Sequence, residues 1–154
     1  MERTVVILKP DSVQRRLVGE IVGRFERKGM KIVAMKMLRV GEDLARRVYA
    51  EHEGKYFHGP LVAFLTSSPV VAMVLEGARA IAVCRALLGP TDGKAAPPGT
   101  IRGDFGNSSR NNLVHASDSP ESAKREMALF FQPQEVLEYD LSIDPWVSWE
   151  PPGR

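Results

Sequence analysis

Residues 4–38, TVVILKPDSVQRRLVGEIVGRFERKGMKIVAMKML, contain the pattern that decides the fold. Thr4–Leu8 is a continuous apolar run, which predicts a short strand buried on both faces. Gly29 provides a C-terminal stop for the helix that follows, and Lys31–Leu38 predicts a second strand. The apolar side chains between them recur at the spacing of one helical face: Val13, Leu17, Ile21 and Phe25. The chain therefore opens with a strand–helix–strand unit.

The same order of elements recurs further along the chain. Val70–Leu75 predicts a third strand, Ala78–Leu88 an apolar helix, and Asn112–His115 a fourth strand. Ser119 is a natural N-cap with Pro120 in the first helical position, which predicts a helix through Phe131. Two smaller helices are expected before the third strand: Glu42 to about Glu53, and Leu61–Thr66. The pattern indicates an α+β fold, an antiparallel sheet with helices on one face.

Length and composition favour one domain, residues 1–154, with an ordinary core. Lys and Arg number 21 against 19 Asp and Glu, and a net charge of +2 argues against binding nucleic acid or a membrane surface by charge alone. No apolar stretch approaches the roughly 20 residues of a membrane span. The single Cys84 cannot form an internal disulfide, which favours a reducing compartment, and we expect a cytoplasmic protein.

Two segments outside these elements are distinctive. Gly89–Gly99 holds three prolines and three glycines, which predicts a long loop of the kind that is usually functional. The tail, 138–154, carries Trp146 and Trp149, and two indoles are costly to leave in water. We therefore expect the tail to dock on the domain or on a neighbouring subunit.

His115 is the strongest candidate for chemistry. It precedes Ser117, Asp118 and Ser119, and Arg102 lies upstream in a segment rich in glycine. An imidazole beside hydroxyls and a guanidinium suits nucleophilic attack on an anionic group, although an isolated histidine at a strand end is more often a packed or surface residue. The histidines show no metal-ligand spacing and no Walker-type glycine loop is present, so no metal site of the protein's own is predicted.

Several blocks in order resemble the nucleoside diphosphate kinase family: ILKPDSVQRRLVGEI, VYAEHEGKYF, CRALLGPTD, GTIRGDF and NNLVHASDS. The likeness runs from about Arg3 to Phe131 and implies a ferredoxin-like βαββαβ core with a four-stranded antiparallel sheet covered by helices. It also implies a ping-pong reaction. In that reaction a nucleoside triphosphate gives its γ-phosphoryl group to the pros nitrogen of His115, and a nucleoside diphosphate then takes it.

The resemblance assigns further roles residue by residue. It places Glu126, Lys9 and Tyr49 with the catalytic histidine, and Phe57 under the base as a stacking ring that tolerates any base. The residues it assigns to the phosphates and sugar are Lys9, Arg85, Thr91, Arg102 and Asn112. Several of these residues have a simpler interpretation when taken alone: the cations and Glu126 as solvated surface charges, and Tyr49 as a core aromatic.

The resemblance also concerns cofactors and partners. Mg²⁺ would arrive on the nucleotide phosphates, and family members assemble as homo-hexamers or homo-tetramers. The alternatives are a non-catalytic nucleotide-binding module and, less in keeping with the charge, a nucleic-acid-binding protein. The chain departs from the family pattern at a few positions: Ser12 for the usual Gly or Ala, Ala116 for Gly, Tyr56-Phe57-His58 for Pro-Phe-Phe, and Ser109 for an aliphatic residue.

Overall fold

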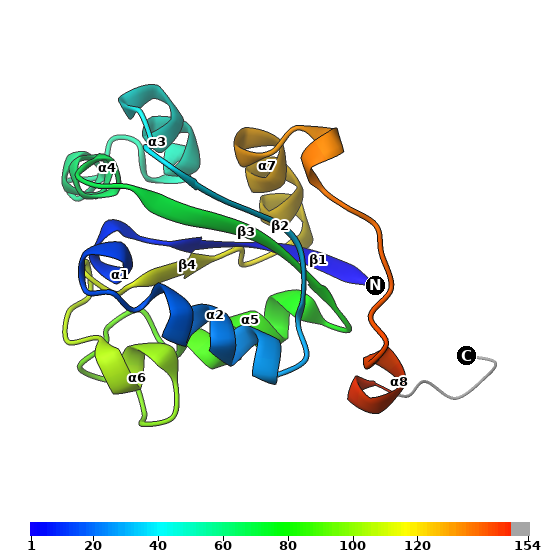
Figure 1. The fold of residues 1–154 in the computed structure, drawn as a ribbon. Helices are drawn as coiled ribbons and strands as arrows, with labels where there is room; N and C mark the ends of the chain where they lie inside the picture. Colours follow the sequence, from blue (N-terminus) through cyan, green and yellow to red (C-terminus); the bar gives the residue numbers. More distant parts are fainter. Residues whose placement is uncertain (149–154) are drawn as a thin grey trace.

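The computed structural model describes residues 1–148, and four strands of this part of the chain form one antiparallel sheet (Figure 1). The strands lie in the order β2-β3-β1-β4, so β1 is central and β2 and β4 are the edges. Their bounds are β1 Glu2–Leu8, β2 Lys31–Leu38, β3 Val70–Gly77 and β4 Val114–Ala116. The predicted ferredoxin-like antiparallel sheet is confirmed.

Helices cover both faces of this sheet, and the expectation of helices on one face was wrong (Figure 1). The helices α3, α4 and α7 pack on one face, and α2, α5 and α6 on the other. The α-helices are α1 Pro10–Gln14, α2 Val18–Arg27, α3 Glu42–Val48, α4 His58–Thr66, α5 Ala80–Leu88, α6 Ile101–Phe105, α7 Pro120–Phe130 and α8 Asp144–Val147. Two short 3₁₀ helices are η1 Ala50–His52 and η2 Pro133–Glu135.

The central strand explains why two layers of helices are needed. Every side chain from Thr4 to Leu8 is fully buried, as the unbroken apolar run predicted. Successive residues of a strand point to opposite faces, so Val5 and Ile7 join the core under α3, α4 and α7. Val6 and Leu8 join the core under α2 and α5. A sheet that is apolar on both faces needs a layer of helices on each face to keep it from water.

Local departures from the expected helices have local causes. The predicted helix through Val13 and Phe25 divides into α1 and α2, because Arg16 adopts a left-handed φ of 59° between them. The stop at Gly29 is confirmed by its φ of 97°. The helix expected from Glu42 ends at Val48 and continues only as η1.

Helix α6 was not expected at all, because its sequence, IRGDF, contains glycine and few helix formers. Its signal is Thr100, whose side chain accepts a hydrogen bond from the Gly103 amide at 2.9 Å and caps the helix. A Cβ on Gly103 would lie 1.8 Å from the Pro97 carbonyl oxygen. Glycine there allows the predicted loop 89–99 to pack directly on α6.

The tail follows edge strand β2 as far as the structure describes it. The Leu137 amide donates to the Val33 carbonyl at 2.8 Å, and Tyr139 and Lys31 also make contact. Trp146 on α8 is 89% exposed, and Trp149 lies outside the described residues. Among residues 1–148 no helix has the length and apolar character needed to cross a bilayer.

Candidate active site

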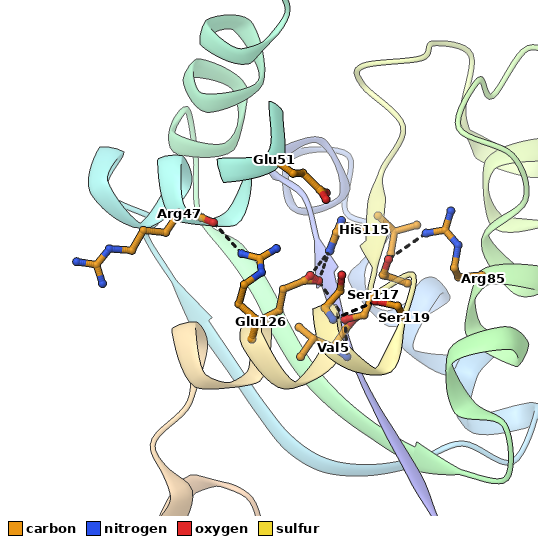
Figure 2. A network of polar contacts seen from close by, with 12 residues as sticks. Val5, Arg47, Glu51, Arg85, His115, Ser117, Ser119 and Glu126 are labelled. Carbon is orange, nitrogen blue, oxygen red and sulfur yellow. Dashed lines mark hydrogen bonds and ion pairs between the residues drawn. The ribbon is translucent and has the colours of Figure 1, made fainter. Parts of the chain in front are cut away.

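The histidine on β4 is held by a buried carboxylate from α7. His115 pairs with Ile7 in the sheet, and its Nε2 lies 2.7 and 2.9 Å from the two carboxylate oxygens of Glu126 (Figure 2). Glu126 is only 2% exposed and also accepts the Ser117 hydroxyl at 3.0 Å. The His115 side chain itself is 27% exposed. The ring is therefore fixed on its Nε2 side and accessible elsewhere.

This arrangement selects one tautomer of His115. A carboxylate accepts hydrogen, so the neutral ring carries its proton on Nε2 and its lone pair on Nδ1. Within residues 1–148 no hydrogen bond reaches Nδ1. A ring with this tautomer, oriented by a carboxylate, is a nucleophile through Nδ1, the pros nitrogen.

Lys9, which follows β1, and Asn112, in the segment before β4, form a buried pair. The Lys9 Nζ donates to Asn112 Oδ1 at 2.8 Å, and the two residues are 5% and 2% exposed. Burial, aided by the nearby Arg102 charge and opposed by Asp11, lowers the pKa of Lys9 to about 8. An ammonium that water solvates so little has a strong need for an anionic partner.

Arg102, on α6, supports the same segment. Its guanidinium donates to the carbonyls of Gly89, Asn112 and Val114 at 3.0, 3.2 and 2.6 Å, and the residue is 5% exposed. Burial, together with the charge of Arg85, lowers its pKa to about 10, so it stays cationic at neutral pH. A guanidinium has five N–H donors, and those not used on the three carbonyls remain for a ligand.

Arg85 is the exposed member of the cation set. It projects from α5, and its Nη1 donates to the Ala116 carbonyl at 3.1 Å, next to His115 on β4 (Figure 2). Together with Lys9 and Arg102 it places positive charge along one side of the histidine. Within residues 1–148 no group of three or more His, Cys, Asp and Glu could hold a metal ion.

A cavity of about 460 Å³ lies near these cations, because Asn112, the partner of Lys9, bonds two of its lining residues. Phe57 precedes α4 and forms part of its wall, with Thr91 from the long loop opposite. His52 and Tyr56 meet the Phe57 ring edge-on at centroid distances of 5.2 and 5.3 Å. The other lining residues are Pro60, Leu61, Ser109 and Arg110. The lining is thus mainly apolar and aromatic, with Thr91, Ser109 and Arg110 as polar members, and we call this cavity the aromatic slot.

Asn112 connects the cavity to the cations. Its Nδ2 donates to the Thr91 and Ser109 carbonyls at 3.0 and 2.9 Å, while its Oδ1 faces Lys9. Arg102 in turn holds the Asn112 carbonyl. These contacts join the cavity lining to Lys9 and Arg102. Arg102 and Arg85 also bond the carbonyls of Val114 and Ala116, the residues on either side of His115.

Tyr49 lies at the end of α3 and is 7% exposed. Burial, with smaller contributions from the Glu126 and Asp11 charges, raises its pKa to about 12. The hydroxyl therefore stays protonated, a donor near both carboxylates. Among residues 1–148 it makes no hydrogen bond to Lys9 or His115.

Comparison with known proteins decides the family. The sequence profile described as nucleoside diphosphate kinase matches residues 2–136. A nucleoside diphosphate kinase of Pelotomaculum thermopropionicum is 56% identical over 96% of this chain and 99% of its own length. The chain belongs to the nucleoside diphosphate kinase family. One from Archaeoglobus fulgidus is likewise 56% identical, over 96% of this chain and 97% of its own.

Solved nucleoside diphosphate kinases share the whole fold. A halophilic nucleoside diphosphate kinase from Halobacterium salinarum, described in complex with CDP, superposes with a TM-score of 0.94 at 51% identity, covering 96% of this chain and 99% of the other. A family protein from Babesia bovis gives 0.93 at 44% identity, covering 96% and 100%. The chain is accordingly a nucleotide-handling phosphotransferase of a family that works through a phosphohistidine.

Sequence reasoning missed some residues of this nucleoside diphosphate kinase site. His52, Tyr56 and Arg110 line the cavity without having been expected there. His52 and Tyr56 lie in the block VYAEHEGKYF with Phe57, which was the available signal. Arg110 lies in the loop before β4, and only tertiary packing brings it to the cavity. Ser109 does lie on the cavity wall with Phe57.

Proposed function

We propose that His115 is the phosphorylated residue of this nucleoside diphosphate kinase and that Nδ1 is the attacking atom. The observation that carries this is the contact of both Glu126 oxygens with Nε2, which leaves the Nδ1 lone pair available. Nδ1 forms a bond to the γ-phosphorus of a nucleoside triphosphate, and the bond from that phosphorus to the bridging oxygen breaks. The departing nucleoside diphosphate keeps the electron pair.

The second half of the reaction reverses the first. A terminal phosphate oxygen of another nucleoside diphosphate attacks the phosphorus, the P–N bond breaks, and Nδ1 recovers its lone pair. Nε2 keeps its proton throughout, so no proton transfer is required. The imidazole gains positive charge while phosphorylated, and the Glu126 carboxylate stabilises that charge in a water-poor setting.

The remaining roles follow the geometry from slot to histidine. Phe57 stacks on the base, while Lys9 and Asn112 reach the sugar hydroxyls and Lys9 also the phosphates. The residues assigned to hold the phosphates along the row of cations are Arg85, Thr91 and Arg102. The Tyr49 hydroxyl, kept protonated by its raised pKa, supports the catalytic group from α3.

Mg²⁺ enters, in this proposal, as part of the nucleotide substrate. The side chains around the phosphates are cationic, and oxygen ligands for a divalent ion come from the phosphates themselves. The magnesium would neutralise phosphate charge and help align the γ-phosphoryl group. The protein contributes the positioning of the chain of phosphates.

We also propose a homo-hexameric or homo-tetrameric assembly in the cytoplasm. Trp146, 89% exposed on α8, is the tail residue that we expect to cover a neighbouring subunit. Cys84 is buried and unpaired, in keeping with a reducing compartment. Light scattering of purified protein tests the assembly, and a monomer at micromolar concentration would contradict it.

The test of the mechanism is labelling with γ-³²P-ATP and Mg²⁺, followed by acid and alkali treatment. A phosphohistidine is labile to acid and stable to alkali, and addition of GDP should remove it as labelled GTP. His115→Ala should take up no label, whereas Glu121→Gln, on the exposed face of α7, should take up label like the unmodified chain. Bound nucleotide without label in the unmodified protein would indicate a non-catalytic binding module.

A further inference from the structure

The residue two positions before His115 has an unusual backbone. Leu113 adopts a φ of 74°, in the left-handed region that non-glycine residues rarely occupy, and its side chain is fully buried. It lies between Asn112 and Val114, whose carbonyls both accept from Arg102. A conformation of this kind persists only where surrounding contacts impose it.

The first turn of α1 supplies those contacts. The Leu113 amide donates to Asp11 Oδ2 at 3.0 Å. The Leu113 carbonyl accepts from the Ser12 hydroxyl at 2.5 Å and from the Lys9 amide at 2.8 Å. Both backbone polar groups of Leu113 are thus held by Lys9 and the first turn of α1, which lies beside the start of β4 (Figure 1). The partners are more than a hundred residues apart in the sequence.

The conformation of Leu113 sets the positions of its neighbours. An extended φ at this residue would turn the Asn112 carbonyl away from Arg102 and the Asn112 side chain away from Lys9. It would also shift the start of β4, which carries His115. The residues that hold Leu113 therefore affect the geometry of the site although they do not themselves contact a nucleotide.

We propose that Asp11 and Ser12 are positioning residues for phosphoryl transfer, holding Leu113 left-handed so that Lys9, Asn112 and His115 stay aligned. This rests on the proposed roles of those three residues. Asp11 acts through the Leu113 amide and through its charge, and Ser12 acts through the Leu113 carbonyl alone.

Ser12 gives this chain a contact that the usual family residue lacks. The family pattern has Gly or Ala here, and neither can donate a hydrogen bond from its side chain. The Ser12 side chain is fully buried, so its hydroxyl would be unsatisfied without the Leu113 carbonyl. The departure noted in the sequence thus adds a second donor to the Leu113 carbonyl, beside the Lys9 amide.

Asp11 has a second influence, on charge. Its carboxylate raises the pKa of Lys9 against the effect of burial. Burial raises the pKa of Asp11 itself, and the hydrogen bond from the Leu113 amide partly opposes that rise. Its Oδ1 is buried without a hydrogen-bond partner among residues 1–148. A partly buried carboxylate that accepts from one backbone amide and acts on one nearby ammonium fits a positioning role.

The experiment compares single-turnover phosphorylation of His115 by Mg-ATP in Asp11→Ala, Asp11→Asn and Ser12→Ala. We expect Asp11→Ala to slow phosphorylation about 10- to 100-fold, since it loses a charge-assisted hydrogen bond. Ser12→Ala should slow it about 3- to 10-fold. Asp11→Asn keeps an acceptor for the Leu113 amide but loses the charge, so its activity should fail at a lower pH than in the unmodified enzyme.

Matched controls separate positioning from stability. Ser67→Ala removes a hydroxyl bonded to a backbone carbonyl at 2.6 Å, as Ser12→Ala does, but on an exposed turn. Asp140→Asn removes an exposed carboxylate of the tail. Both should phosphorylate at the unmodified rate, and circular dichroism should show every variant folded at the assay temperature.

The outcomes are distinct. Folded Asp11 variants with the unmodified rate and pH profile would overturn the proposal, and so would Ser12→Ala behaving like Ser67→Ala. If Asp11→Ala does not fold, Asp11→Asn and Ser12→Ala decide the question by the same criteria. Absence of label on His115 in the unmodified enzyme would instead refute the proposed function, on which this inference depends.

Discussion

The buried ammonium of Lys9 leads to a quantitative prediction for Lys9→Met. Methionine keeps the length of the side chain and removes the charge. The pKa of Lys9 falls from 10.5 to about 8 on folding, so folding disfavours the charged ammonium relative to the neutral amine by about 3 kcal/mol. Lys9→Met also loses the bond to Asn112, a cost that is independent of pH over this range. The pH dependence therefore isolates the charge.

The sign follows from proton binding. Below about pH 8 the ammonium is charged in both states, and the folded state bears the full cost of burying it. Between about pH 8 and 10.5 the unfolded chain binds more protons, so the stability of the unmodified protein rises with pH. Cys84 and Tyr49, whose pKa values are raised to about 12, oppose this trend, but both proteins contain them and their effect cancels in the difference.

Urea unfolding of both proteins at about pH 7, 8, 9 and 10, at one protein concentration, measures that difference. Relative to Lys9→Met, the unmodified protein should gain about 2.5 kcal/mol as pH rises through this range, with most of the gain above about pH 8. Its kcat/KM for ATP should fall over the same range as the ammonium loses its proton. A stability difference that does not change with pH would refute the reasoning.

Three further variants test the site. Glu126→Gln should slow phosphorylation of His115 about 10-fold, because a neutral amide balances the imidazole charge poorly. Glu121→Gln, on the exposed face of α7, should leave the rate unchanged, and equal rates in the two variants would count against the role of Glu126. Arg102→Ala should lower the free energy of unfolding by about 2–4 kcal/mol, because it leaves buried carbonyls unpaired. The exposed Arg85→Ala should lower it by less than about 1 kcal/mol, and similar losses in urea unfolding would contradict the structural role of Arg102. Phe57→Ala should raise KM for ATP, GTP and CTP alike by about 10-fold in steady-state assays, and a change confined to one base would exclude simple stacking.

Much of the fold could be predicted because its signals are local. The apolar runs at Thr4–Leu8, Lys31–Leu38 and Val70–Leu75 lie within the observed β1, β2 and β3. Ser119 accepts from the Ser122 amide at 3.1 Å and caps α7, as its position before Pro120 predicted. These features depend on neighbours a few residues away, which the sequence displays directly.

The sequence by itself determined the first three strands, the main helices between them and the residue types that gather around His115. It placed the fourth strand at Asn112–His115, two residues before the observed start of β4 at Val114, and it did not show α6. Only the tertiary structure decided that helices cover both faces of the sheet and that Glu126 meets Nε2 rather than Nδ1. It also decided that Leu113 is held left-handed by α1. The physical reason is distance along the chain: Lys9 and Asn112 are 103 residues apart, and Leu113 and Asp11 are 102 apart. Contacts of that range depend on packing, and no local periodicity encodes them.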